Sequence, residues 1–91
     1  MDGFEDVLSL LYRFNSPGYV LSVTVYDEEG KTVRRLSRNL YAGISGVVKW
    51  DGIRDDGARA AVGNYILHAE AFSDRGQVVS KKLLVALLLR N

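Results

Sequence analysis

Three aspartates in one short loop are the side chains best placed to bind an ion. Asp51, Asp55 and Asp56 lie within six residues of one another, and Ca²⁺ takes six or more oxygen ligands from clustered carboxylates and carbonyls. Their spacing does not match an EF-hand loop, which needs acidic or amide residues at alternating positions and a distal glutamate. In the competing interpretation, Asp51 accepts backbone N–H bonds and holds the turn after Trp50. Calcium is therefore the weaker of two hypotheses for this loop.

No group of residues in the chain predicts catalysis. His68 is the only histidine, and strand alternation places it on the face opposite Tyr65 and Leu67, toward solvent. A general base needs an orienting partner and a substrate proton within reach. Ser45 and Ser80 lie in strand-like segments rather than at a nucleophile elbow. We expect no enzyme activity and no cofactor.

Two further groups of side chains suggest ligand surfaces, and each has a simpler interpretation. The basic group consists of Lys31, Arg34, Arg35 and Arg38, and the aromatic group of Tyr19, Tyr26, Tyr41 and Phe72. Because the formal net charge is only +1, we interpret the basic group as a solvated strand edge and expect no nucleic-acid partner. The aromatic group could form a carbohydrate platform, but Tyr19 and Tyr26 fall on opposite faces of one strand. Packing is the better interpretation.

Length and composition favour one domain over residues 1–91, with residues 1–6 as a ragged lead-in. The chain has 91 residues, 47% of them hydrophobic and 25% charged, and no cysteine, which excludes disulfides and thiolate metal sites. The most apolar stretch, 83–89, is far shorter than the roughly 18–20 residues of a membrane span, so we expect no membrane insertion. No basic-then-apolar signal region opens the chain. We expect a domain excised from a longer protein.

Hydrophobic alternation predicts strands almost throughout the chain. We expect them at residues 7–14, 19–27, 31–38, 44–50, 64–73 and 77–89. A helix starting near Asp6 is the competing interpretation of the first segment, but its aromatic residues and the turn at 15–18 favour a strand. Val33 and Leu36 are three residues apart, which predicts a bulge or an edge strand. The sequence therefore predicts an all-β fold, an immunoglobulin- or fibronectin-like antiparallel β-sandwich of about seven strands.

The loop between the fourth and fifth segments is the centre of this predicted fold. Trp50 closes one strand and Tyr65 opens the next, and we expect both rings to anchor the core beneath the loop. Asp-Gly pairs favour tight reversals, because glycine takes positive φ cheaply and aspartate bonds its own backbone. The structural signature consists of Trp50, Asp51, Gly52, Gly57, Gly63 and Tyr65.

The last segment is apolar on both faces, although a strand in a two-layer sandwich needs only one buried face. Val85 and Leu87 can fill the core, which leaves Leu84 and Leu88 of the same segment without cover. The candidate interaction surface on the outer side consists of Ile66, Phe72, Leu84 and Leu88. One interpretation is a lid formed by the lead-in, with Phe4. The other is a docking surface for a neighbouring domain, a second copy or export machinery.

The run from Tyr12 to Leu87 resembles the immunoglobulin-like domain of the flagellar hook-capping protein FlgD and its relatives outside flagella. The residues that carry the resemblance are Tyr26-Asp27, Gly30, Val33-Arg34-Arg35-Leu36, Gly43, Trp50-Asp51-Gly52, Gly57 and Gly63-x-Tyr65. It is also similar to C-terminal modules of secreted or surface proteins of Bacteroidetes-type bacteria, including type IX sorting domains. In those modules a basic-apolar strand ends the domain, as residues 81–85 do here.

The resemblance implies a non-catalytic module from the C-terminal end of a larger exported or cell-surface bacterial protein, acting in docking, spacing or sorting. Its partners would be other domains of the parent protein or the export machinery, with a homo-oligomer possible through the apolar terminal strand. Its location would be extracellular, at the cell surface, or periplasmic. The alternatives are a hook-cap-like flagellar assembly domain and a carbohydrate-binding accessory module of a hydrolase.

Overall fold

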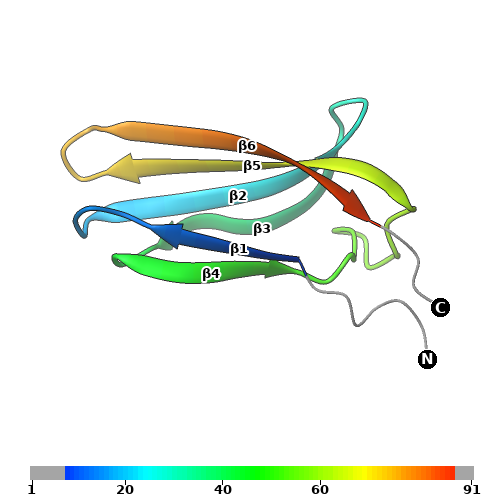
Figure 1. Ribbon diagram of the computed structural model, residues 1–91, viewed down its shortest axis with the longest axis horizontal. Coiled ribbons are helices and arrows are strands. Elements are labelled where there is room, and N and C mark those ends of the chain that lie inside the picture. Colours follow the sequence, from blue (N-terminus) through cyan, green and yellow to red (C-terminus); the bar gives the residue numbers. More distant parts are fainter. Residues whose placement is uncertain (1–7, 88–91) are drawn as a thin grey trace.

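The computed structural model describes residues 8–87, which form an antiparallel β-sandwich of two unequal layers (Figure 1). The strands are β1 (Leu8–Arg13), β2 (Tyr19–Asp27), β3 (Thr32–Tyr41), β4 (Ser45–Trp50), β5 (Gly63–Ser73) and β6 (Val78–Leu87). The large layer has the order β3-β2-β5-β6, and β1 pairs with β4 in the small layer. The predicted all-β antiparallel sandwich is confirmed, but these residues contain six strands rather than about seven.

The edge strand β3 differs most from its predicted bounds. It continues to Tyr41, three residues beyond the end predicted from the sequence at Arg38. The predicted bulge is present, because the β2–β3 register shifts between Val23 and Thr24. The Ser37 hydroxyl bonds to the backbone of β2 where the hydrogen-bond ladder between the strands is interrupted. It accepts the Val23 N–H (3.1 Å) and donates to the Leu21 carbonyl (3.1 Å). A side chain therefore satisfies backbone groups that the bulge leaves unpaired.

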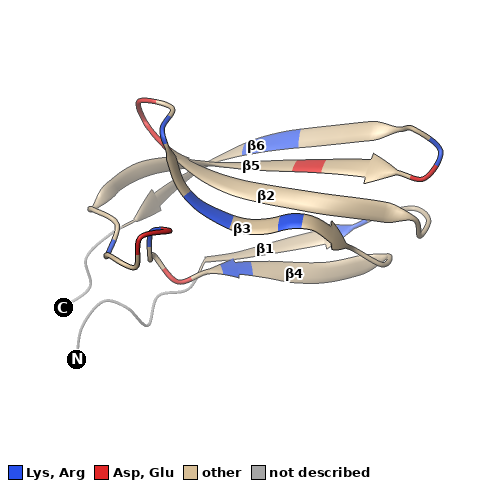
Figure 2. Cartoon of the chain, turned by 180° about the vertical axis from the view of Figure 1, so that it is seen from behind, with Lys and Arg blue, Asp and Glu red and all other residues tan. Residues whose placement is uncertain are grey.

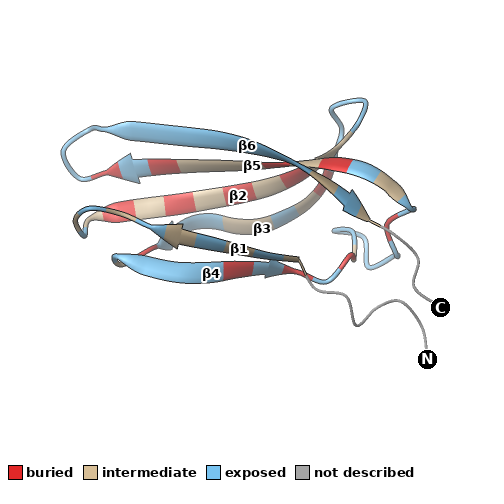
Figure 3. Cartoon of the chain, in the orientation of Figure 1, coloured by how far each residue is buried: buried red, intermediate tan, exposed pale blue. Residues whose placement is uncertain are grey.

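The core lies between β2 and β5 of the large layer and the small layer that faces them. Burial alternates strictly along β2, where β-branched residues suit a half-buried pleated surface. The buried apolar residues of the core are Tyr19, Leu21, Val23, Val25, Val33, Ala42, Val48, Trp50, Ala60, Tyr65, Leu67 and Ala71. Burial is concentrated on β2 and β5, whereas β6 is exposed along most of its length (Figure 3).

Tyr12 joins the small layer to the end of β3. Its hydroxyl donates to the Ala42 carbonyl (2.9 Å), and its ring lies over Gly46, its partner on β4. A Cβ at Gly46 would fall 2.5 Å from the Tyr12 hydroxyl oxygen, so the close approach of this ring requires glycine. The aromatic row continues through Phe14, which stacks on Tyr19 with ring centroids 4.3 Å apart.

Candidate functional site

The corner between β4 and β5 is built on two buried aromatic rings. Trp50 is 2% exposed and Tyr65 is 6% exposed, and the rings meet edge to face with centroids 5.4 Å apart at 69°. The Trp50 Nε1–H donates to the Ile53 carbonyl (3.0 Å), and the Tyr65 hydroxyl donates to the Ala61 carbonyl (2.5 Å). Both polar groups of the pair are therefore satisfied by the backbone of the loop between the strands.

The surroundings of Tyr65 also shift the pKa of its hydroxyl. Burial raises the pKa of this phenol above its ordinary value of 10.0, Arg54 lowers it, and Asp27 and Glu28 raise it further. A tyrosine near the start of a strand that bonds to the backbone a few residues upstream is the tyrosine corner of immunoglobulin-like sandwiches. The sequence pattern placed this ring in the core but did not predict the hydroxyl bond.

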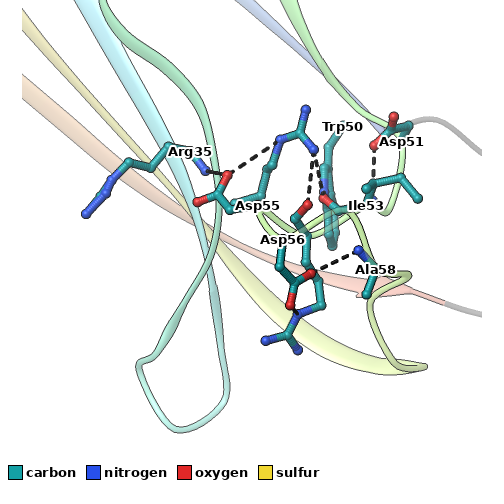
Figure 4. Close-up of polar contacts among 9 residues, drawn as sticks. Arg35, Trp50, Asp51, Ile53, Asp55, Asp56 and Ala58 are labelled. Carbon is teal, nitrogen blue, oxygen red and sulfur yellow. Dashed lines mark hydrogen bonds and ion pairs between the residues drawn. The ribbon is translucent and has the colours of Figure 1, made fainter.

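Two of the three loop aspartates hold turns (Figure 4). Asp51 Oδ1 accepts the Ile53 N–H (3.0 Å), and Asp56 Oδ1 accepts the Ala58 N–H (2.9 Å). Asp56 also lies 3.6 Å from Arg54 Nε through its other oxygen. These are aspartate turns, in which the side chain replaces a backbone acceptor.

Asp55 instead fastens the loop to the edge of the large layer. Its Oδ1 accepts the Arg35 N–H on β3 (3.2 Å) and lies 3.8 Å from Arg34 Nε (Figure 4). The Asp55 N–H donates to the Val33 carbonyl (2.9 Å), and Arg34 Nη1 donates to the Ile53 and Arg54 carbonyls (3.3 and 3.4 Å). Arg34, interpreted from the sequence as part of a solvated edge, is thus a clamp between β3 and the loop.

The loop carboxylates do not converge on one point. Each bonds a different backbone N–H, and across residues 8–87 no group of three His, Cys, Asp or Glu side chains could hold a metal ion. The geometry therefore supports the turn-forming interpretation of Asp51, and it adds nothing to the calcium hypothesis for Asp51, Asp55 and Asp56.

Two glycines of the structural signature have positive φ angles in the same loop. Gly52 has φ +82° and Gly57 has φ +87°, in the left-handed region that favours glycine. Gly52 is also buried, and a Cβ there would lie 3.6 Å from Leu87 of β6. The loop therefore packs closely against the end of the last strand.

The outer face of the large layer carries two apolar rows, one at each end. Cross-strand pairing forms Tyr26-Ile66-Leu84 at one end and Tyr41-Val20-Phe72-Val78 at the other. Between them lie the polar rows Thr24-His68-Lys82 and Ser22-Glu70-Ser80. Leu84 is 75% exposed and Phe72 41%. Of the predicted interaction surface, the structure thus leaves Leu84 and Phe72 open and Ile66 half-buried, while Leu88 lies outside the described residues, as does Phe4 of the predicted lid.

The aromatic residues and the histidine considered in the sequence analysis do not lie together. Tyr19 is buried in the core, with its hydroxyl bonded to Gln77 (3.0 Å), and Tyr26 lies at the opposite end of the outer face from Phe72 and Tyr41. The four aromatic residues therefore form no single platform. His68 lies on the outer face, as alternation predicts, with its ring 6.4 Å from that of Tyr26.

Among residues 8–87, five of the eleven basic residues lie on β3 and β6, whereas six of the eight acidic residues lie in the loops (Figure 2). Lys31 pairs with Glu29 at an exposed turn (3.8 Å), an arrangement that contributes little to stability in water. The part of the chain that the structure describes contains no helix long and apolar enough to cross a membrane.

Two facing antiparallel layers, a buried tryptophan and a tyrosine corner define an immunoglobulin-like β-sandwich domain. The model of the FlgD Ig-like domain family matches residues 4–81, and the chain belongs to this family. Among solved structures it is similar to the crystal structure of CopC from Methylosinus trichosporium OB3b, with a TM-score of 0.56 and 21% identity over 86% of this chain and 72% of that chain. At that identity the similarity shows the fold alone. No curated protein matches the chain.

Proposed function

We propose that this domain is a non-catalytic interaction module of a larger exported or cell-surface bacterial protein, placed outside the cytoplasm. It docks other protein domains through the outer face of the large layer. Membership of the FlgD Ig-like domain family supports a module of this kind. The observation that carries the proposal is the pair of apolar rows on that face, with Leu84 75% exposed.

The pattern of the outer face is that of a protein interface. The two apolar rows are separated by rows that carry Glu70, His68 and Lys82. Protein interfaces combine apolar contact areas, often aromatic, with polar groups that set orientation. Phe72 and Tyr41 flank Val20 at one end, so that row offers an aromatic contact area.

A hook-cap-like flagellar assembly domain is the second candidate function, and the same family match supports it equally. It also acts by protein contacts, so the identity of the partner distinguishes the two. The aromatic residues do not favour a carbohydrate-binding module, because Tyr19 is inside the core and Tyr26 is apart from Phe72, which leaves only Tyr41 and Phe72 of the four in one row.

Site-specific photo-crosslinking in the full-length protein, in its own cells, tests the proposal. A photoreactive residue replaces Leu84 or Phe72 on the outer face, and Lys49, exposed on β4 of the other layer, serves as the matched control. Mass spectrometry of the crosslinked peptides should identify one other domain or protein at both outer positions and not at the control. Equal crosslinking at the control position, or none at Leu84 and Phe72, would refute docking through this face.

A further inference from the structure

Within residues 8–87, the two layers of the sandwich leave a groove open between β1 and β6. β4 contacts β3, so β1 is the free border of the small layer and stands opposite the β5–β6 half of the large one. In Figure 1, β6, β5, β2 and β3 follow one another from the top, and β1 and β4 lie below them. The groove has a volume of about 380 Å³ and is lined by residues of β1, β2, β5 and β6.

The floor of this groove is a set of inward-facing side chains without cover. Leu67 on β5 is 2% exposed, whereas its partner Leu83 on β6, in the same inward row, is 41% exposed. Ala71 is likewise buried, and its partner Val79 is open to solvent. In a sandwich such a row is covered by a strand of the facing sheet, so one further strand beside β1 would complete the core.

In the part of the chain that the structure describes, the border of β1 offers unpaired backbone groups to such a strand. The Phe14 N–H donates to the Ile44 carbonyl (2.7 Å), and in an antiparallel pair the bonded residues alternate. The register then directs the backbone of Leu10 and Tyr12 toward β4, and that of Leu11 and Arg13 toward the groove, which both residues line. An edge of unpaired N–H and C=O groups is a template for an added strand.

The charge around the groove selects the kind of strand. Its lining contains two basic residues, Arg13 and Lys81, and no acidic one. Neither basic residue forms an ion pair with any partner among residues 8–87. Carboxylates on an incoming strand would meet both cations, and complementary charge sets the partner and its register.

The charge of the strand edges disfavours a second copy of this chain as the occupant of the groove. The edge strands β1, β3, β4 and β6 all carry lysine or arginine, and none carries aspartate or glutamate. Pairing any two of these edges between copies would therefore offer no carboxylate from the incoming strand to Arg13 or Lys81. The occupant has to bring the acidic groups itself.

We propose that the groove binds an extended segment of a partner polypeptide, which pairs with β1 as a third strand of the small layer. The segment is apolar at the alternate positions that point onto Val79 and Leu83, and it carries carboxylates within reach of Arg13 and Lys81. This inference rests on the proposal that the domain is an interaction module, but it uses a different surface from the outer face.

A nine-residue synthetic peptide tests the inference, titrated into the ¹⁵N-labelled domain to millimolar concentration. Its inward positions carry valine, except for one central aspartate opposite Lys81, which lies between Val79 and Leu83 in the inward row, and its outward positions carry aspartate or threonine. The amide shifts should saturate and cluster on β1 and β6. Lys81→Glu should weaken binding about fivefold or more. Lys82→Glu makes the same charge change on the outer face and should leave the affinity within about twofold. Leu11→Pro removes one groove-facing N–H and should abolish binding while β4 stays paired.

Three results would overturn the inference. The first is no saturable shift at millimolar peptide, and the second is equal weakening by Lys81→Glu and Lys82→Glu. The third is a dimer in sedimentation velocity without peptide that Leu11→Pro converts to a monomer, which would place a second copy on this edge. If Leu11→Pro fails to fold, the lysine pair still decides the outcome. Loss of outer-face crosslinking would leave the titration unchanged, so the two proposals fail separately.

Discussion

Replacing Trp50 by leucine should remove a large part of the stability of this domain, because three contributions disappear together. The indole is 2% exposed, and large-to-small changes in a packed core cost about 2–5 kcal/mol. The Nε1–H bond to the Ile53 carbonyl contributes about 1 kcal/mol, and the edge-to-face contact with Tyr65 about 0.5–1.5 kcal/mol. Because these contributions overlap, we expect a loss of about 4 kcal/mol. Roughly 5–14 kcal/mol is the usual total for a chain of this length.

The assay is guanidinium unfolding followed by far-UV circular dichroism for the wild type, Trp50→Leu, Tyr65→Leu and the double variant. The coupling energy from the double-mutant cycle should be about 0.5–1.5 kcal/mol. Val47→Ala is the matched control, since Val47 lies on β4 but is exposed, and should change the unfolding free energy by less than about 0.5 kcal/mol. A Trp50→Leu variant within about 1 kcal/mol of the wild type would refute the reasoning.

Further predictions concern the same corner and the Tyr12 contact. Tyr65→Phe should cost about 1 kcal/mol of unfolding free energy below pH 10. Because the folded pKa is raised, this difference should shrink as pH rises above 10, and a constant difference up to pH 12 would contradict the burial effect. Gly46→Ala should cost about 1–3 kcal/mol through overlap with Tyr12, and the double change with Tyr12→Leu should recover part of that loss. Addition of 10 mM Ca²⁺ should leave the melting temperature unchanged, both for the wild type and for Asp51→Asn. A calcium-dependent rise of several degrees in the melting temperature would restore the metal hypothesis.

Alternation of period two was sufficient to predict the strands and the inward faces of β2 and β5. Each of these strands has one face against the core, so apolar and polar residues alternate at the pleat period. The same pattern placed Trp50 and Tyr65 inside, and the spacing of Val33 and Leu36 indicated the bulge that the structure shows. Local chemistry also indicated the turn bond of Asp51.

The extent of each layer could not be predicted, because alternation shows which face of a strand is apolar but not whether a facing strand covers it. Val79 and Leu83 have the pattern of core residues, yet both are exposed above the groove. Long-range polar contacts were missed for a related reason. The clamp between Arg34 and the loop joins residues about twenty positions apart, and nothing local in the sequence specifies that partnership.

Amide hydrogen exchange along β1 in the free domain tests the open groove most directly, because it measures whether the sandwich is open at this border. We expect alternation: the amides of Leu10, Tyr12 and Phe14 are protected by β4, while those of Leu11 and Arg13 exchange rapidly. Uniform protection along β1 would mean that a strand already occupies the edge, and it would contradict the open groove.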